Sequence, residues 1–244
     1  MSTRQVKLVY ISDYNCPWCY IGLRELQRAI QQTSGFGFQF EIEMRPFMLN
    51  HGICAIPSDC ASRETYLKKK MGPERWEQCK QVVTAKGEEC GINFALGGPM
   101  SDTLLAHRLT AKALEVDGRG AALKIAHPIF RAYHEDELDI NDPNVLADIA
   151  QEVDLMSKEE ALEFLKSDEL SDKVLAQVNE ARAKGVTGVP FTIIDGKWAV
   201  SGGQSAPVFV KIFSKLAQAC DGSGVCTPKV HVAADNICHD AIAA

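Results

Sequence analysis

The chain has 244 residues, enough for one large domain or for a core domain with one insertion. Hydrophobic residues make up 46% and charged residues 24%, as is ordinary for a globular protein, and the net charge of −6 argues against a general nucleic-acid binder or a protein of anionic membrane surfaces. No apolar run reaches transmembrane length, and the run that begins at Val6 is too early and too short for a signal peptide. We therefore expect a cytoplasmic protein without a membrane partner.

The first part of the chain has the pattern of a strand, a helix and a second strand. Residues 6–11 form a mostly apolar run, typical of a buried strand, and apolar residues at helical spacing follow the Cys-Pro-Trp-Cys run at 16–19. The helix is expected to stop near Ser34, and residues 38–47 then alternate as in a strand. This order predicts a right-handed βαβ unit.

Only helical patterns follow up to about residue 165. The predicted helices are 66–71, 73–87, 101–116, 119–134, 144–153 and 158–165. Candidate helix-start residues are Ser101 or Asp102, Asp142, and Ser157 with Glu160 at capping-box spacing. A helical block of about 100 residues is too long for a loop, so it is expected to form a subdomain.

Strands return at 191–194 and 198–200, joined by Asp195-Gly196, the strongest short signal for a β-hairpin. An amphipathic helix is predicted over 205–219. The sequence therefore predicts an α/β protein with a large all-helical insertion. Its expected divisions are an α/β domain made of 1–61 and 170–219, the insertion at 62–169, and a cysteine-containing tail at 220–244.

Nine cysteines are many for a chain expected in a reducing compartment. Because the number is odd, they cannot all pair within the chain, and close pairs in such a compartment indicate catalysis or metal binding. The spacings are Cys16-x2-Cys19, Cys54-x5-Cys60, Cys79-x10-Cys90 and Cys220-x5-Cys226, with Cys238 left over. The first of these pairs stands where a strand leads into a helix.

That position suits disulfide exchange. Unpaired backbone N–H groups and the dipole at a helix start stabilise a thiolate. Pro17 suits the first helical position, where its missing N–H would have no partner. Cys19 lies one turn further on the same face, within reach of the first sulfur. Cys16 is therefore predicted as the nucleophile and Cys19 as the resolving thiol.

A chance spacing or half of a zinc site is the alternative interpretation of this motif. A zinc site would need a second ligand pair in a loop or knuckle, so the strand and helix context favours redox chemistry. The tail also holds cysteines and histidines at 220, 226, 231, 238 and 239, but their spacing matches no compact zinc template. No metal is therefore predicted.

A second loop signal, Gly-Val-Thr-Gly-Val-Pro at 185–190, stands directly before a strand. Proline after two glycines marks a backbone that takes a special path. A cis Val189–Pro190 bond is one candidate, and an ordinary trans turn is the commoner arrangement.

Together these motifs resemble the thioredoxin-like DsbA family, and in particular its cytosolic FrnE-like, or polyketide-isomerase-like, branch. Beyond the two motifs above, the resemblance rests on segments 106–109, 129–133, 139–147, 194–196 and 201–204, and it extends over about 5–219. It implies an α/β, thioredoxin-like fold with a large all-helical insertion, as in DsbA.

The resemblance also implies the roles of site residues. The bond before Pro190 would be cis, with this proline against the active-site cysteines, and Val189 would pair its backbone with an extended substrate strand. Trp18 would tune the reduction potential and offer an apolar surface near the sulfur. Pro17 completes the expected substrate-binding set.

Several residues keep two interpretations. Asp13 is either a proton acceptor for Cys19 or, as favoured, a turn carboxylate. His107 and Arg108 could face the cleft above Cys16, although buried histidines are more often structural. Cys220 and Cys226 are either a second redox pair or solvent-facing thiols of the tail. Expected structural residues are Cys79, Phe130, Tyr133 and Phe164 in the core and Cys90 near a helix end. Cys54 and Cys60 are expected as free thiols, with a pair under oxidation as the alternative.

The predicted function is reversible exchange with peptide or small-molecule disulfides or dithiols. It requires no cofactor, and glutathione is a candidate co-substrate. The alternative is a glutathione-dependent transferase or isomerase of the kappa class or the 2-hydroxychromene-2-carboxylate isomerase type. These relatives typically carry serine at the position of Cys16 and lack the second thiol. A third interpretation is a holdase-like binding module, and the sequence leaves a homodimer open.

Overall fold

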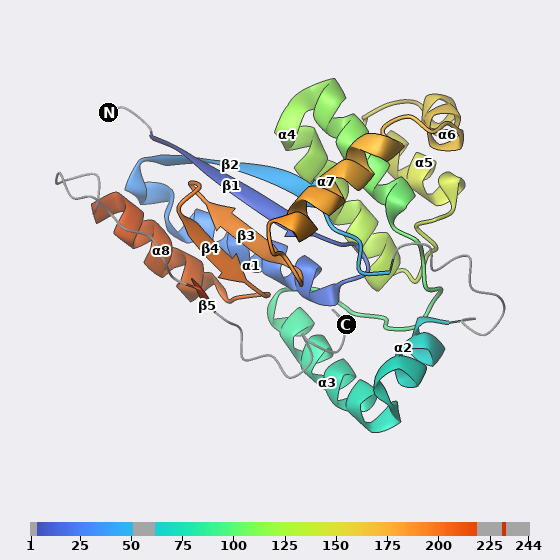
Figure 1. Cartoon of the computed structure of the whole chain (residues 1–244), viewed down its shortest axis with the longest axis horizontal. Coiled ribbons are helices and arrows are strands. Elements are labelled where there is room, and N and C mark those ends of the chain that lie inside the picture. The colour runs from blue at the N-terminus through green and yellow to red at the C-terminus, as the bar shows by residue number, and fades with distance from the viewer. Residues whose placement is uncertain (1–3, 51–61, 219–230, 233–244) are drawn as a thin grey trace.

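The computed structural model describes residues 4–50, 62–218 and 231–232 (Figure 1). Its centre is a five-stranded sheet in the order β2-β1-β3-β4-β5. The strands are β1 (Arg4–Ser12), β2 (Phe38–Pro46), β3 (Phe191–Ile194), β4 (Trp198–Ser201) and β5 (His231–Val232). β1 pairs in parallel with β2 and antiparallel with β3, while β4 pairs antiparallel with β3 and in parallel with β5. The sheet is therefore mixed.

Helix α1 (Pro17–Gln32) joins β1 to the parallel strand β2, so the predicted βαβ unit is confirmed. In β1 the side chains of Val6, Leu8 and Tyr10 are completely buried. Every second side chain of the segment is thus directed into the core, which is the pattern of a β-strand with one buried face. The predicted hairpin at Asp195-Gly196 is also present, with both residues at positive φ (53° and 66°), as a tight two-residue turn requires.

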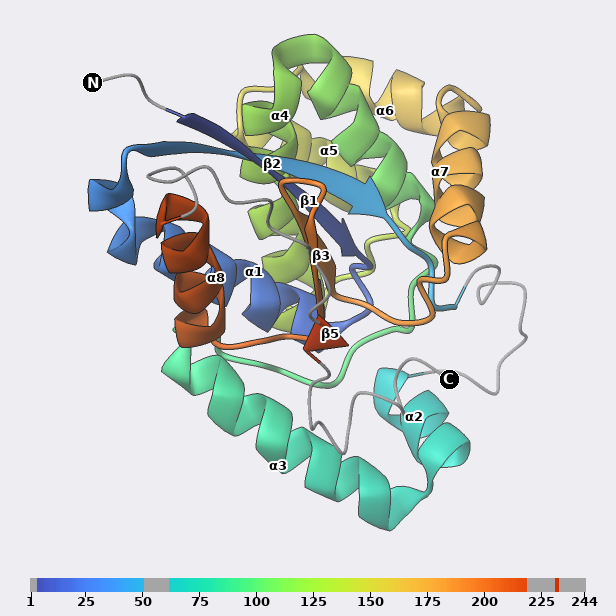
Figure 2. The same cartoon turned by 60° about the vertical axis from the view of Figure 1, so that its left-hand side comes forward.

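The remaining helices form two groups on the sheet and one separate arm. They are α2 (Arg63–Met71), α3 (Pro73–Glu89), α4 (Leu104–His134), α5 (Pro143–Glu152), α6 (Lys158–Lys166), α7 (Ser171–Ala183) and α8 (Ala206–Gln218), with a short 3-10 helix η1 (Ser34–Phe36). Helices α1 and α8 pack together on one face, and α4 and α7 contact β2 on the other (Figures 1 and 2). The arm of α2 and α3 projects from the rest of the molecule, and α3 contacts α1 (Figure 2). The predicted all-helical insertion is thus observed, while the division into domains stays a prediction.

The start of α4 differs from the prediction. Neither Ser101 nor Asp102 is the N-cap, because the helix begins at Leu104 with Thr103 as its N-cap. Asp102 still accepts a hydrogen bond from the Leu104 N–H at 2.8 Å, whereas the Ser101 hydroxyl donates to Asp139 at 2.6 Å. Asp102 therefore satisfies the first free N–H of the helix from one residue before the N-cap.

The other helix boundaries largely follow the predicted signals. The predicted break inside α4 is present, since Asp117 and Gly118 have non-helical backbone angles. Asp142 is the N-cap of α5, and Ser157 forms the predicted capping box with Glu160. These short-range hydrogen bonds explain why the sequence pattern marks the helix starts correctly.

Besides the short helix η1, helix α7 and strand β5 were not predicted. Helix α7 buries only Val174, Val178 and Ala181, so its apolar stripe is too narrow to stand out in the sequence. Strand β5 is two residues long and is defined by its pairing with β4. A strand of this kind depends on its partner and leaves no pattern of its own.

We expect the Gly22→Ala variant to unfold at a lower urea concentration than the wild type. A Cβ at Gly22, in the middle of α1, would lie 2.8 Å from the Tyr10 hydroxyl and 3.1 Å from Pro190 Cγ. Overpacking of this kind costs about 1–3 kcal/mol, which exceeds the gain in helix propensity of about 1 kcal/mol. Gly120→Ala is the matched control, because Gly120 lies in α4 and a Cβ added there would meet nothing within 4 Å. It should be neutral or stabilising, and equal destabilisation by both variants would contradict this account.

Candidate active site

The start of α1 holds the two cysteines of the Cys-Pro-Trp-Cys run. Cys16 is the N-cap residue with an extended backbone, and Pro17 occupies the first helical position. The turn that precedes α1 is closed by a hydrogen bond from the Cys16 N–H to Asp13 O at 3.1 Å. Within the motif, the Cys19 N–H donates to Cys16 O at 3.0 Å. Both cysteines are free thiols. Cys16 therefore lies where helix N–H groups and the helix dipole favour a negative sulfur.

The loop before β3 lies directly against Cys16. The Val189–Pro190 peptide bond is cis. The Cys16 thiol donates to Val189 O at 3.4 Å across 173 residues of sequence, and the Gly202 N–H fixes the same loop by donating to Pro190 O at 2.8 Å. The structure thus brings together Cys16, Val189 and Pro190, which the sequence identified separately.

The second thiol is completely buried. Cys19 is 0% exposed, and its carbonyl accepts a hydrogen bond from the Tyr10 hydroxyl at 2.7 Å. Burial raises the pKa of Cys19 well above its ordinary value, and its hydrogen bond and electrostatic interaction with Cys16 act in the same direction. Cys19 is therefore a protonated thiol at neutral pH.

Trp18 is less exposed than the resemblance implied, and its expected effect on the reduction potential stays a prediction. Its side chain is 2% exposed, so it offers almost no open apolar surface near the sulfur. Gly203, beyond the end of β4, packs against it so closely that a Cβ there would lie 3.0 Å from Trp18 O and 3.1 Å from Cε3. The ring therefore packs α1 against the loop after β4.

Asp13 and His107 form a buried polar pair behind the cysteines. The Asp13 carboxylate accepts from the Leu49 N–H at 2.8 Å and from the Asn15 N–H at 3.5 Å, as the favoured turn role requires. His107 Nε2 lies 2.9 Å from Phe47 O and 3.4 Å from Asp13 Oδ1. These contacts tie the loop after β2 to the loop that carries Cys16.

Arg108 does not face the cleft above Cys16, so one of the two interpretations left open for it is wrong. Its guanidinium donates to the carbonyls of Phe164, Leu165, Ser167 and Glu169, at and beyond the end of α6. The side chain is 3% exposed. Consecutive residues on a helix point in different directions, so Arg108 supports α6 while His107 reaches the loops behind the site.

The other predicted residues are structural or lie outside the described part of the chain. Phe130, Tyr133, Phe164 and Cys79 are buried, and Cys90 is the C-cap residue of α3, as predicted. The Cys90 thiol donates to Glu25 Oε1 at 3.1 Å, and burial raises the pKa of this thiol to about 12. The predicted free thiols at Cys54 and Cys60 and the pair of Cys220 and Cys226 lie outside the described residues.

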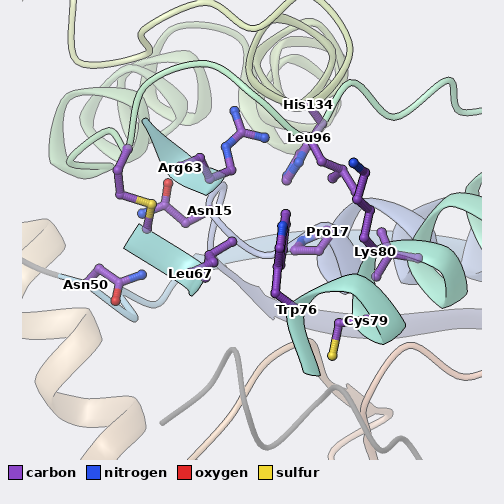
Figure 3. A pocket seen from close by; sticks show the side chains of 12 residues that line it. Asn15, Pro17, Asn50, Arg63, Leu67, Trp76, Cys79, Lys80, Leu96 and His134 are labelled. Carbon is purple, nitrogen blue, oxygen red and sulfur yellow. The ribbon is translucent and has the colours of Figure 1, made fainter. Parts of the chain in front are cut away.

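Three residues beside the motif were not predicted from the sequence. Tyr10 holds the Cys19 carbonyl, and Arg63 and His134 line a narrow cavity that also reaches Asn15 and Pro17 (Figure 3). Arg63 is the first residue of α2 and His134 the last of α4. No local pattern marks them, because they meet only when the helical insertion packs against α1.

Comparison with known proteins identifies the family. The model of the DSBA-like thioredoxin domain matches residues 7–214. The uncharacterized protein YwbO of Bacillus subtilis (strain 168) is 27% identical over 213 residues, which are 86% of this chain and 96% of that protein. In the described part of the chain, no helix is long and apolar enough to span a membrane.

Two solved structures have the same fold. A probable DsbA oxidoreductase from Streptomyces coelicolor superimposes with a TM-score of 0.74 at 26% identity, over 91% of this chain and 93% of that chain. A 2-hydroxychromene-2-carboxylate isomerase superimposes with a TM-score of 0.66 at 16% identity, over 89% of this chain and 100% of that chain. The predicted thioredoxin-like fold with its helical insertion is therefore confirmed, and the chain belongs to the family of DSBA-like thioredoxin domains.

Proposed function

We propose that this protein is a thiol–disulfide oxidoreductase that works through Cys16 and Cys19. One observation carries the proposal: the Cys16 thiol stands at the N-terminus of α1, between the second thiol of the motif and the carbonyl of Val189. A nucleophile, a resolving thiol and a backbone edge for substrate thus share one place.

In this reaction the electrons pass from the two thiols, Cys16 and Cys19, to the disulfide substrate. The Cys16 thiolate attacks one sulfur of a disulfide, a mixed disulfide forms, and the other sulfur leaves as a thiolate that takes up a proton. Cys19 then loses its proton and attacks the Cys16 sulfur, which releases the second thiol of the substrate. The substrate gains two electrons, and the protein becomes the Cys16–Cys19 disulfide. Two molecules of glutathione return it to the dithiol and become glutathione disulfide.

Substrate binding is assigned to the backbone beside Cys16. Val189 and Pro190 would hold an extended peptide or small-molecule disulfide, with Pro17 and Trp18 packed behind the reacting sulfur. Pairing of Cys220 with Cys226 as a second redox centre, the FrnE-like branch, a homodimer and a cytoplasmic location remain predictions. The isomerase or transferase alternative has less support, because both thiols are in place.

The first experiment is equilibration in glutathione buffers, followed by thiol trapping and peptide mass mapping. A two-electron transition that maps to Cys16 and Cys19 is the expected result, and a further transition at Cys220 and Cys226 would support the second redox pair. Tight glutathione binding without any pairing of Cys16 and Cys19 would instead favour the isomerase or transferase.

The Cys19→Ser variant should accumulate a mixed disulfide with its substrate. Without the second thiol the complex at Cys16 has no intramolecular route to release. Mass spectrometry of the acid-quenched reaction should detect the adduct on the peptide that contains Cys16. An adduct on another cysteine, or none, would contradict the division of roles.

Release of the mixed disulfide should accelerate with pH. The raised pKa of Cys19 means that the folded protein keeps this thiol protonated beyond the ordinary pKa of about 8.5, so its thiolate fraction grows about tenfold per pH unit between about pH 6 and pH 8. Quench-flow trapping measures release in the wild type, and adduct formation in Cys19→Ser measures the first attack alone. A release rate that stays flat with pH would show that Cys19 is not held as a buried thiol.

A further inference from the structure

A cleft lies where the two helical layers meet beside the edge strand β2. This strand is the outermost of the sheet, with α1 on one face and α4 on the other (Figure 2). The cleft between these three elements has a volume of about 620 Å³, against about 20 Å³ for the cavity beside Pro17. Pockets for small molecules usually have volumes of about 300–1,000 Å³, so this cleft has the size of a ligand site.

Apolar side chains from all three elements line the cleft. They are Ile30 of α1, Phe40 of β2 and Leu123 of α4, and each of them is only partly buried. Gly120 of α4 lines the same cleft, and a Cβ added there would meet nothing within 4 Å. An apolar group bound in the cleft would therefore remove from water a surface that the fold itself leaves accessible.

Arg24 adds a cation without an ion-pair partner to the lining. Its Nη2 donates to the Tyr20 hydroxyl at 3.3 Å, and that hydroxyl donates to Glu135 Oε1 at 2.9 Å. Within the described ranges no carboxylate pairs with Arg24 directly, because Glu135 is reached only through Tyr20. Of the other two guanidinium nitrogens Nε is buried, whereas Nη1 keeps accessible surface and makes no hydrogen bond to this part of the chain. Nη1 is thus open to an acceptor on a ligand.

His127 of α4 lines the cleft and responds to the charge of Arg24. Burial, and then that charge, lower the pKa of His127 to about 4. The ring is therefore neutral at pH 7, and Gln27 Nε2 donates to its Nε2 at 2.9 Å. The positive field of Arg24 thus reaches the opposite helix, and His127 adds no charge that would change its sign.

The remaining charges of the lining are already paired. Arg119 Nη1 forms an ion pair with Glu41, and its Nη2 lies 3.6 Å from Glu43 Oε2. The lining therefore holds two arginines and one carboxylate, so Arg24 leaves it with an excess positive charge. The whole protein carries a net charge of −6, so this local excess has the opposite sign to the rest of the molecule.

We propose that this cleft binds a small organic anion, with its carboxylate on Arg24 and its apolar body against Ile30, Phe40 and Leu123. The carboxylate would accept a charge-assisted hydrogen bond from Nη1. The site is separate from the thiols, since neither Cys16 nor Cys19 lines it. The inference therefore goes beyond the proposed function and involves no disulfide chemistry.

The test titrates the protein with 4-phenylbutyrate and with its uncharged amide, 4-phenylbutyramide, followed by NMR. The anion should bind about tenfold more tightly than the amide, and the signals of the Gly120 backbone and the Gln27 side chain should shift. Arg24→Gln should remove this preference and leave the affinity for the amide within about twofold. Arg28→Gln is the matched control, because Arg28 lies one turn further along α1, pairs with Glu25 and does not line the cleft. Equal loss of the preference in both variants would overturn the site.

A second variant keeps the proposal testable if Arg24→Gln does not fold. Gly120→Leu places a side chain in the cleft and should weaken the binding of both compounds about fivefold or more. Cys16→Ser should bind 4-phenylbutyrate like the wild type even if it reduces no disulfide, so the site and the proposed function can fail independently. No binding of the anion at millimolar concentrations, or shifts that gather around Cys16 and Val189, would overturn the cleft as its site.

Discussion

The Cys16→Ser variant is expected to lose disulfide reduction by roughly 10³-fold or more, because it removes the group that forms the mixed disulfide. Serine keeps the size of the side chain and a donor toward Val189 O, which the Cys16 thiol meets at 3.4 Å. The fold should therefore survive while the chemistry is lost. Reduction of insulin or glutathione disulfide, followed by the consumption of a coupled reductant, measures the loss.

Cys90→Ser provides the matched control for this prediction. It makes the same replacement at a half-buried cysteine whose hydrogen bond to Glu25 a hydroxyl can also form. Its rate should stay within about twofold of the wild type. Full activity in Cys16→Ser would overturn the oxidoreductase assignment, and activity that survives loss of both Cys16 and Cys19 would favour a holdase-like binding module.

The Arg108→Leu variant is expected to lower the free energy of unfolding by about 2–5 kcal/mol. Its guanidinium donates to four backbone carbonyls at and beyond the end of α6, including Ser167 O at 2.7 Å and Glu169 O at 2.8 Å. Helix-end carbonyls have no partner within their own helix, so these carbonyls lose a buried donor when the side chain is shortened and made apolar, although Phe164 O keeps the N–H and hydroxyl of Ser167. Urea denaturation followed by circular dichroism measures the change.

The control for Arg108 lies on the same helix. Arg131 of α4 has a side chain that is 64% exposed and a surface ion pair with Asp136 at 3.4 Å, so Arg131→Leu should change stability by no more than about 0.5 kcal/mol. Equal midpoints for Arg108→Leu and the wild type would mean that the end of α6 does not depend on this side chain.

The features that the sequence predicts well are those set by neighbours along the chain. The hairpin at Asp195-Gly196, the capping box of Ser157 with Glu160 and the start of α1 at Cys16-Pro17 each depend on residues within one turn or one tight loop. Their hydrogen bonds and backbone angles are local, so the residue types at that spacing suffice to identify them.

The features that the sequence misses depend on partners far along the chain. Strand β5 requires β4, and Arg108 finds its acceptors more than 50 residues further on, at Phe164 to Glu169. The burial of Trp18 could not be predicted from the sequence for the same reason. Its place in the motif suggests an exposed surface, yet the approach of Gly203 covers it.

By itself, the sequence determined the pair of thiols, the helix start at the first of them, and the α/β fold with its helical insertion, because local chemistry and periodicity encode all three. Only the tertiary structure decided that Val189 O lies against the Cys16 thiol, that Cys19 is buried with a raised pKa, and that Arg108 is buried with its acceptors at and beyond the end of α6. Burial and charge pairing depend on which distant segments pack together, and no single stretch of sequence carries that information.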